Sequence, residues 1–545
     1  PVLGSIKTDE STDIRLNSEV EMQSLSSWIG DPLMKQLQGG FQFESELSIP
    51  LDNSQPTRYW LRSDSVGIST DLPVPLKKVA ENERPLELLA SISPGGDSVM
   101  DIVWGEEFNF SVDFNEGGSV AAASFGIASD HPAKEVGKLV GNAALEDLDY
   151  LEWQPLFEGE STSDLPLQPQ LNISSQSTWF SGQDIGPITS QIALNEKDIE
   201  ITFYSQFSEG LFLFEKQNRT RPHVLLVDWL DIALIPGISD SDDDDSSGTD
   251  EKGSDFDPRK LPAMVVDIQL LRKAESEWGK WNFELQPHDL GLSVTNIYAT
   301  FAGSTIEAGG SSQIDWGYNG EDHLTEMDLQ LSLGDVGEIF ELSGKSAAVS
   351  SESGSIDLNL GWLGKPWQPT LAQLSGTVNL TLNDGKFDAQ AEGDELLKLI
   401  ALFSIDNWGR RLKFDFSDLS EDGTGYDSFR GNFGVENGLV TTLSPVQISL
   451  TTGDLRFSGD MDLLENQVDA ELIATLPVRN NLAWVTTAFM GVGAGAAVWL
   501  FGELFKDELD SMASVTYLVT GDIDSPDIDA RSATEVQAPD PEEDS

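Results

Sequence analysis

The chain has 545 residues, and its 93 acidic residues against 32 basic ones give a formal net charge of -61. Such a charge argues against nucleic acid as a partner, and the absence of cysteine excludes disulfides, thiol catalysis and Cys-ligated metals. With 39% hydrophobic residues, including 26 Phe and 14 Trp, the chain is nevertheless too apolar to be disordered.

Short segments that alternate apolar and polar residues recur from Gly40 onward, for example at 41–51, 108–114 and 264–270. This period of two predicts antiparallel strands with one apolar face. Helical patterns are few, and the main early candidate is 142–153, where leucines recur at helical spacing. We therefore expect a mainly β fold with few short helices, and not an α/β fold.

Residues 239–257 are dominated by Asp, Glu, Ser and Gly and predict a solvated, disordered loop. A calcium site is the alternative, because carboxylate oxygens are the ligands that calcium prefers, but the EF-hand spacing is absent. The end of the chain, 531–545, is also acidic and predicts a frayed tail.

The final third has the most regular strand pattern. A turn is predicted at Asn383-Asp384-Gly385, a short helix at 394–403, and a hairpin at Asn437-Gly438, a dipeptide that strongly favours a two-residue β-turn. Between these features, apolar residues continue to alternate with polar ones.

Residues 482–502 carry no charge and could span a bilayer by length, since about 20 apolar residues suffice. The chain then returns to a strand pattern, which a span would leave without pairing partners. We therefore expect an apolar helix or helical hairpin that lies on or dips into a membrane, or that caps the end of a groove. The expected membrane contacts are Trp484, Phe489, Trp499, Leu500, Phe501 and Phe505.

At about 12 residues per strand, the patterned part of the chain predicts roughly 30 strands. A sheet of that size curls or splits. With almost no helices to cover it, a curled sheet would leave an apolar groove, whereas a stack of sandwiches would bury the same residues as core. Periodicity does not separate these two arrangements.

No enzyme is predicted. His131, His223, His288 and His323 are scattered without the spacing of a helical metal site, so that we expect neither a metal nor a cofactor. Nucleophile-elbow, dinucleotide and phosphate-loop motifs are absent from suitable strand-turn-helix settings.

Several segments resemble the AsmA-like family of envelope proteins, and in particular its YhdP branch. The resemblance extends over most of the chain, and the segments that carry it are 67–78, 279–287, 360–369, 374–387, 393–419, 425–442 and 482–528. The resemblance implies an elongated, curled antiparallel sheet, a repeating β-groove, which is anchored in the inner membrane of a Gram-negative bacterium and crosses the periplasm. It implies transport of phospholipid to the outer membrane, with the C-terminal helix at that membrane. The family's N-terminal anchor is missing here, so we expect a fragment.

The expected parts are β-groove segments 1–238 and 258–392, the acidic loop 239–257, an AsmA-like C-terminal β region 393–478, an apolar helical element 479–512, a final strand 513–530 and the tail 531–545. A phospholipid acyl chain needs a dry path, which any continuous apolar lining supplies. The expected lining residues are Val378, Leu380, Leu382, Leu412, Phe414, Phe416, Phe433, Val435, Val446, Ile448, Leu450, Leu455, Phe457, Val468, Leu472, Val515, Tyr517 and Val519. The alternative is a structural or adhesive β-rod with closed cores, in which these residues are only core.

Overall fold

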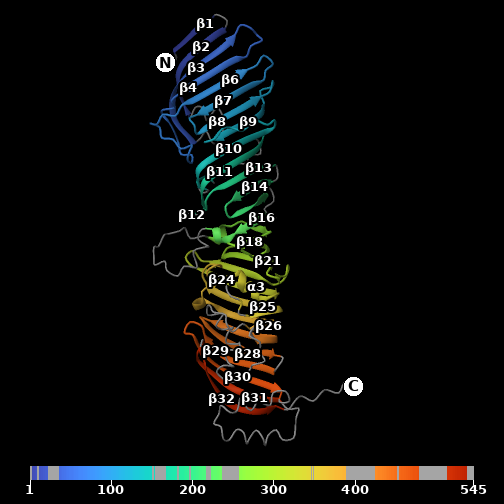
Figure 1. The fold of residues 1–545 in the computed structure, drawn as a ribbon. Coiled ribbons are helices and arrows are strands. Elements are labelled where there is room, and N and C mark those ends of the chain that lie inside the picture. Colours follow the sequence, from blue (N-terminus) through green and yellow to red (C-terminus); the bar gives the residue numbers. More distant parts are fainter. Residues whose placement is uncertain are drawn as a thin grey trace. The chain divides into compact units, whose positions relative to one another are not determined.

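The chain is described by a computed structural model (Figure 1). It describes residues 3–8, 11–22, 36–149, 152–153, 167–180, 183–195, 198–215, 222–235, 257–344, 347, 349–387, 424–450, 453–477, 512–523 and 525–536. The chain divides into two compact units, Pro1–Phe256 and Asp257–Ser545. Each unit is built almost entirely of strands, which confirms the mainly β fold class.

The strands of the first unit follow one another along the chain, separated mostly by short turns. They are β1 (Leu3–Thr8), β2 (Ser11–Glu21), β3 (Leu37–Pro50), β4 (Thr57–Ser63), β5 (Ile68–Thr70), β6 (Leu86–Ile92), β7 (Ser98–Trp104), β8 (Phe108–Phe114), β9 (Val120–Ile127), β10 (Lys138–Asp149), β11 (Gln168–Phe180), β12 (Gln183–Asp184), β13 (Ile188–Leu194), β14 (Asp198–Ser205), β15 (Ser208–Glu215) and β16 (His223–Asp231), followed by the 3-10 turn η3 (Ile232–Leu234).

Most of these strands pair antiparallel with the next in sequence, from β1 to β4, from β6 to β9 and from β13 to β16. β4 pairs with β6, while the short β5 pairs with the first residues of β3. β10 is the exception, because it runs parallel to both of its neighbours, β9 and β11. Two parallel neighbours require a connection that carries the chain from the end of the first strand back to the end at which that strand began. Residues 128–137 make that return between β9 and β10.

The second unit has the same strand-after-strand order and little helix. Its elements are η5 (Pro258–Lys260), β17 (Met264–Ile268), β18 (Leu271–Lys273), β19 (Ser276–Glu277), β20 (Lys280–His288), β21 (Gly291–Phe301), β22 (Ser304–Ile306), β23 (Gln313–Tyr318), β24 (His323–Leu333), α3 (Val336–Leu342), β25 (Val349–Leu363), η6 (Leu371–Gln373), β26 (Ser375–Phe387), β27 (Thr424–Glu436), β28 (Leu439–Leu450), β29 (Gly453–Asp462), β30 (Gln467–Pro477), β31 (Met512–Asp522) and β32 (Asp527–Val536).

Every pairing along the main order of this unit is antiparallel. The order runs from β17 through β20, β21 and β23 to β24, and then continues one strand at a time to β32. The helix α3 lies between β24 and β25, and the Asp335 carboxylate caps it by accepting a hydrogen bond from the Gly337 backbone N–H.

The turn predictions met different outcomes. The Asn437-Gly438 hairpin is confirmed, because β27 ends at Glu436, β28 begins at Leu439, and both turn residues have positive φ. The turn at Asn383-Asp384-Gly385 is wrong, since β26 continues through it. Pairing with β25 and β27 on both sides holds the segment extended, and Asp384 merely takes a φ of 50° within the strand.

The helix expected at 142–153 is also wrong over most of its length, because residues up to Asp149 belong to β10. Pairing with β9 and β11 outweighs the helical spacing of the leucines. Several other expectations lie outside the described residues: the acidic loop apart from Asp257, the helix 394–403, the apolar stretch 482–505 and the end of the tail. The segment 513–530 contains most of β31 and the start of β32, where one strand was expected.

Candidate functional site

One face of the sheet in the first unit is apolar, and the strand register shows how it is built. Leu61, Leu88, Ile102, Phe110 and Phe125 lie directly opposite one another on β4, β6, β7, β8 and β9. Because side chains alternate between faces, their neighbours two positions away share the same side. We call this side of each unit's sheet the apolar face.

Much of the apolar face in the first unit remains in contact with solvent. The side chains of Leu61, Leu88, Ile102 and Phe110 are only partly buried. At the strand positions further along the same side, Leu16 is 36% and Ile92 is 52% exposed. A run of partly exposed large apolar residues over neighbouring strands is typical of a binding surface rather than of a closed core.

The opposite face carries ion pairs between neighbouring strands. Arg15 on β2 lies 2.9 Å from Glu46 on β3, and Arg62 on β4 lies 3.2 Å from Glu87 on β6. Both arginines and Glu87 are exposed to water, and only the Glu46 side chain is largely covered, at 13% exposure. Ion pairs that water reaches contribute little to stability. This face also has isolated apolar side chains, among them the exposed Leu89. The two faces therefore differ in character, although the polar one is not uniform.

Residues 64–84 fold over part of the apolar face in the first unit, and we call this segment the strap. Its Ile68 packs against Phe41 of β3 in a buried cluster. Further along the strap, Leu76 packs with Ile127 of β9 and Leu145 of β10. The strap thus covers apolar positions from β3 to β10 that would otherwise face solvent.

Two basic residues fasten the strap through backbone carbonyls. The Lys78 ammonium donates hydrogen bonds to the Ser65 and Ile68 carbonyl oxygens, both at 2.9 Å, and Lys78 is only 5% exposed. Burial, followed by the nearby charge of Arg84, lowers the pKa of Lys78. The Arg84 guanidinium donates to the carbonyls of 75, 76 and 77, and it also lies over the Trp104 ring at 4.7 Å. These contacts close the strap on itself and tie it to β7.

The apolar face of the second unit is built in the same way. Leu329, Leu358, Val378 and Phe433 lie opposite one another on β24 to β27. A second row crosses the later strands through Val446, Phe457, Leu472 and Tyr517 on β28 to β31. All of the predicted lining residues that the structure describes fall on this face by register. Leu412, Phe414 and Phe416 lie outside the described residues, and Val515 is placed only by its position opposite Ala474.

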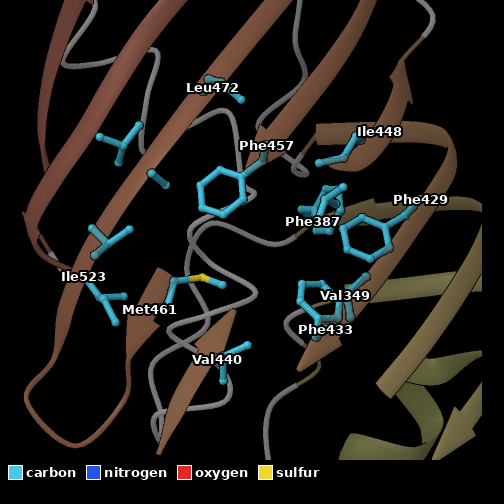
Figure 2. Close-up of a cluster of buried hydrophobic side chains, with 14 of the residues drawn as sticks. Val349, Phe387, Phe429, Phe433, Val440, Ile448, Phe457, Met461, Leu472 and Ile523 are labelled. Carbon is cyan, nitrogen blue, oxygen red and sulfur yellow. The ribbon is translucent and has the colours of Figure 1, made fainter. Parts of the chain in front are cut away.

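The two parts of this face differ in burial. Leu329, Leu358 and Val378 are partly buried, as in the first unit. Val446, Phe457 and Val519 are 0% exposed and belong to one large hydrophobic cluster, part of which Figure 2 shows. Several predicted lining residues on β28 to β31 are therefore closed from solvent here. Periodicity in the sequence identifies the face of a residue but carries no information on what covers it.

The helix α3 lies against the apolar face in the middle of the second unit. Val336, Ile339 and Phe340 of α3 pack against the cluster of β25 to β31. Ile339 and Leu342 also contact the neighbouring cluster, which contains Ile297 and Phe301 of β21. Like the strap in the first unit, α3 covers part of the face with its own apolar side chains.

Two hydroxyl groups on the apolar face are buried without a partner. Ser45 of β3 and Tyr517 of β31 are 1% and 2% exposed, and neither hydroxyl has a hydrogen-bond partner in the described part of the chain. Burial raises the pKa of Tyr517 above its usual value of about 10, so that its hydroxyl stays protonated. Sequence reasoning named Tyr517 for its ring alone, because an alternating pattern does not reveal whether a hydroxyl is satisfied.

The open positions of the first unit were not among the predicted site residues. The segment 108–114, FNFSVDF, was interpreted only as a strand, although its Phe110 faces the same side as Leu61 and Leu88. The alternation of this segment would have identified Phe110 as a site residue, but only together with the register of the neighbouring strands.

Polar clusters elsewhere on the sheet have structural roles. Ser124 of β9 lies 3.0 Å from the Nδ1 atom of His131, which belongs to the connection 128–137, but Ser124 is completely buried. Lys134 of the same connection donates to Ser111 of β8, which fixes the connection on the polar face. Within the described ranges, no group of three or more His, Cys, Asp or Glu is placed to hold a metal ion. No helix in those ranges is long and apolar enough to cross a membrane.

Comparison with known proteins gives two matches. A family model described as YhdP protein matches residues 1–528. A curated protein of Escherichia coli (strain K12), named intermembrane phospholipid transporter YhdP, is 22% identical over 251 residues, which make up 46% of this chain and 20% of that protein. The aligned region thus spans a fifth of this relative.

Proposed function

Because the chain belongs to the YhdP family, we propose that it carries phospholipid along its apolar face between the inner and outer membranes, within the periplasm of a Gram-negative bacterium. The acyl chains lie against the apolar face, and the headgroup remains in water beyond its rim. The name of the Escherichia coli relative supports phospholipid as the cargo.

The observation that carries the proposal is the partly exposed apolar face, which recurs in both units. Leu88 of the first unit and Leu358 of the second occupy equivalent places, each in a row of apolar side chains across neighbouring strands. Each CH₂ group moved out of water contributes about 0.8 kcal/mol, so that a continuous apolar path lowers the cost of moving an acyl chain through an aqueous compartment. No single side chain is needed for this chemistry.

The acidic character of the chain supports a path that holds acyl chains rather than one that attracts headgroups. With a net charge of -61, the protein repels anionic lipid surfaces at a distance. Recognition then depends on apolar contact, which salt does not screen. For the membrane end, we propose that the apolar stretch 482–505, with Trp484 and Trp499 at the headgroup boundary, makes the contact.

The experiment that tests the proposal places a photoreactive amino acid on either face of one strand. Leu88 lies on the apolar face of β6, and Leu89, the next residue, lies exposed on the opposite face. Expression in a Gram-negative host, irradiation and mass spectrometry should give phospholipid adducts at 88 and not at 89. Leu358 and Asp357 on β25 form the equivalent pair in the second unit. Equal labelling on the two faces, or no co-purifying phospholipid, would contradict the proposal.

A second candidate function is a structural β-rod with closed cores. The complete burial of Val446, Phe457 and Val519 favours it for β28 to β31. The partial exposure of the apolar face on β2 to β8 speaks against it for the first unit. A rod would give no lipid adducts at either Leu88 or Leu358.

A further inference from the structure

Tyr517 places a polar group deep within the apolar face of the second unit. It lies on β31, opposite Leu472 of β30 and Ala530 of β32. Its side chain is 2% exposed and belongs to the same cluster as Phe457 and Val519. The hydroxyl has no hydrogen-bond partner among the residues that the structure describes.

A buried hydroxyl without a hydrogen-bond partner destabilises the folded protein when no ligand is bound. A buried hydroxyl without a partner costs about 1–3 kcal/mol, and phenylalanine would fill nearly the same volume without that cost. The other buried tyrosine of this cluster shows the usual solution, because the Tyr426 hydroxyl donates to the Ser350 carbonyl oxygen at 2.7 Å. Tyr517 is therefore a donor that an acceptor from outside the described chain would satisfy.

We propose that the Tyr517 hydroxyl donates a hydrogen bond to an ester carbonyl oxygen of a diacyl phospholipid, whose acyl chains enter the cluster that excludes solvent from Tyr517 in the lipid-free chain. This inference rests on the proposed function. The ester is the polar group closest to the acyl chains, so that it enters an apolar surface together with them. A neutral donor suits this neutral acceptor.

The phosphate of the lipid is a poorer partner for this site. A charged group in an apolar environment needs several donors or a counter-charge. The residues around Tyr517 on the apolar face of the neighbouring strands are Phe457, Leu472, Val519 and Ile528, none of which supplies either. A single phenol hydroxyl among aliphatic and aromatic side chains therefore suits the neutral ester carbonyl and not the charged phosphate.

The test compares Tyr517→Phe with the wild-type chain and uses Tyr426→Phe as the matched control. Each protein is incubated with vesicles of diacyl phosphatidylcholine or of its dialkyl ether analogue, which has the same headgroup but no ester carbonyl. Bound lipid is measured by mass spectrometry, and the thermal midpoint is measured on lipid-free protein.

We expect the wild type to bind the diacyl lipid about fivefold more tightly than the ether lipid, as one net hydrogen bond allows. Tyr517→Phe should lose this preference while its lipid-free midpoint stays the same or rises, because the unsatisfied hydroxyl is gone. Tyr426→Phe should lower the midpoint and keep the preference. Unchanged diacyl binding by Tyr517→Phe would overturn the inference, and equal loss for both lipids would overturn the ester assignment. If the wild type binds neither lipid, the proposed function itself fails.

Discussion

Lys78 is a buried charged residue that holds the strap in place over the apolar face. Its ammonium donates to the Ser65 and Ile68 carbonyls of the strap at 2.9 Å each, and to the Val79 carbonyl at 3.3 Å. Replacing it with methionine keeps the aliphatic stem but leaves the carbonyls of Ser65 and Ile68 without their donor. We expect Lys78→Met to lower the free energy of unfolding by about 1–3 kcal/mol in urea titrations. The exposed neighbour Lys77 is the control, and an equal effect of Lys77→Met would refute this role.

A glutamate on the apolar face should act differently at open and closed positions. Phe457 is 0% exposed, so that Phe457→Glu buries a charge and should unfold the second unit whichever function is correct. Leu16 is 36% exposed, and its replacement by glutamate should change stability by less than about 1 kcal/mol while reducing co-purified phospholipid. Asn17 faces the other side of β2, so Asn17→Glu is the matched control. Normal lipid content in Leu16→Glu would argue for a surface without lipid.

Tyr426 and Tyr517, two buried tyrosines of the second unit, predict a loss of stability at high pH. Burial raises the pKa of Tyr426 and Tyr517 above the usual value of about 10. Between the unfolded and folded pKa values, only the unfolded chain gives up the protons, so stability is unaffected well below pH 10 and falls as the pH rises above it. Urea titrations of the wild type and of the doubly substituted Tyr426→Phe, Tyr517→Phe chain check this. Parallel pH profiles would contradict it.

At the scale of residues, the sequence predicted the face on which a side chain lies but not its burial. Val378, Phe433 and Phe457 were assigned to one face by alternation, and the register places them there. Their burial differs, because Val378 is only partly buried, whereas Phe433 is 6% and Phe457 0% exposed. Lys78 gave no signal, because a buried lysine paired with carbonyls looks in sequence like any surface lysine.

The strand β10 has a tight contact that its parallel neighbour imposes. A Cβ atom added at Gly141 would lie 2.2 Å from the Phe125 ring of β9, which covers the glycine from the opposite strand position. We expect Gly141→Ala to destabilise the first unit by about 1–3 kcal/mol through overpacking, measured by thermal and urea unfolding. Gly95 lies in the turn before β7 with open space around its Cα, so Gly95→Ala should be neutral. Similar losses from both changes would exclude the ring contact as the cause.

At the scale of elements, local signals were reliable only where no long-range pairing opposed them. Asn437-Gly438 joins two strands that pair with each other, so that turn propensity and register agree. At Asn383-Asp384-Gly385 and at 142–149 the local signals point to a turn and a helix, but pairing with two flanking strands holds both segments extended. A single sequence does not reveal which strand will lie beside a given segment.

The charge of the whole chain predicts a strong dependence on salt. The chain has 93 acidic residues and only 32 basic ones, and the repulsion between the excess negative charges destabilises the folded state. Salt screens this repulsion, because the Debye length falls from about 30 Å at 0.01 M salt to about 3 Å at 1 M. We expect the thermal midpoint to rise steadily over this range of sodium chloride. Sucrose, which carries no charge, is the control for solvent exclusion. A midpoint that responds to sucrose and not to salt would contradict the explanation.

For the whole molecule, the sequence predicted the class and the one-sided character of the strands, because alternation is a property of each strand by itself. The expected boundary between segments 1–238 and 258–392 lies next to the division after Phe256, but the sequence did not predict the strap or the reversal at β10. These depend on which segments meet, and the contacting residues, such as Leu76 and Leu145, are far apart in the sequence.

The parallel pairings of β10 have a mechanical consequence. In a hairpin, the two chain ends leave from the same end of the strand pair, so that tension along the chain breaks the hydrogen bonds one after another. In a parallel pair, they leave from opposite ends of the strands, so that the same tension loads all of the hydrogen bonds together. In a chain stretched from its two termini, the antiparallel strands should peel away singly at low force. The three strands β9, β10 and β11 should hold as a clamp until the force is much higher.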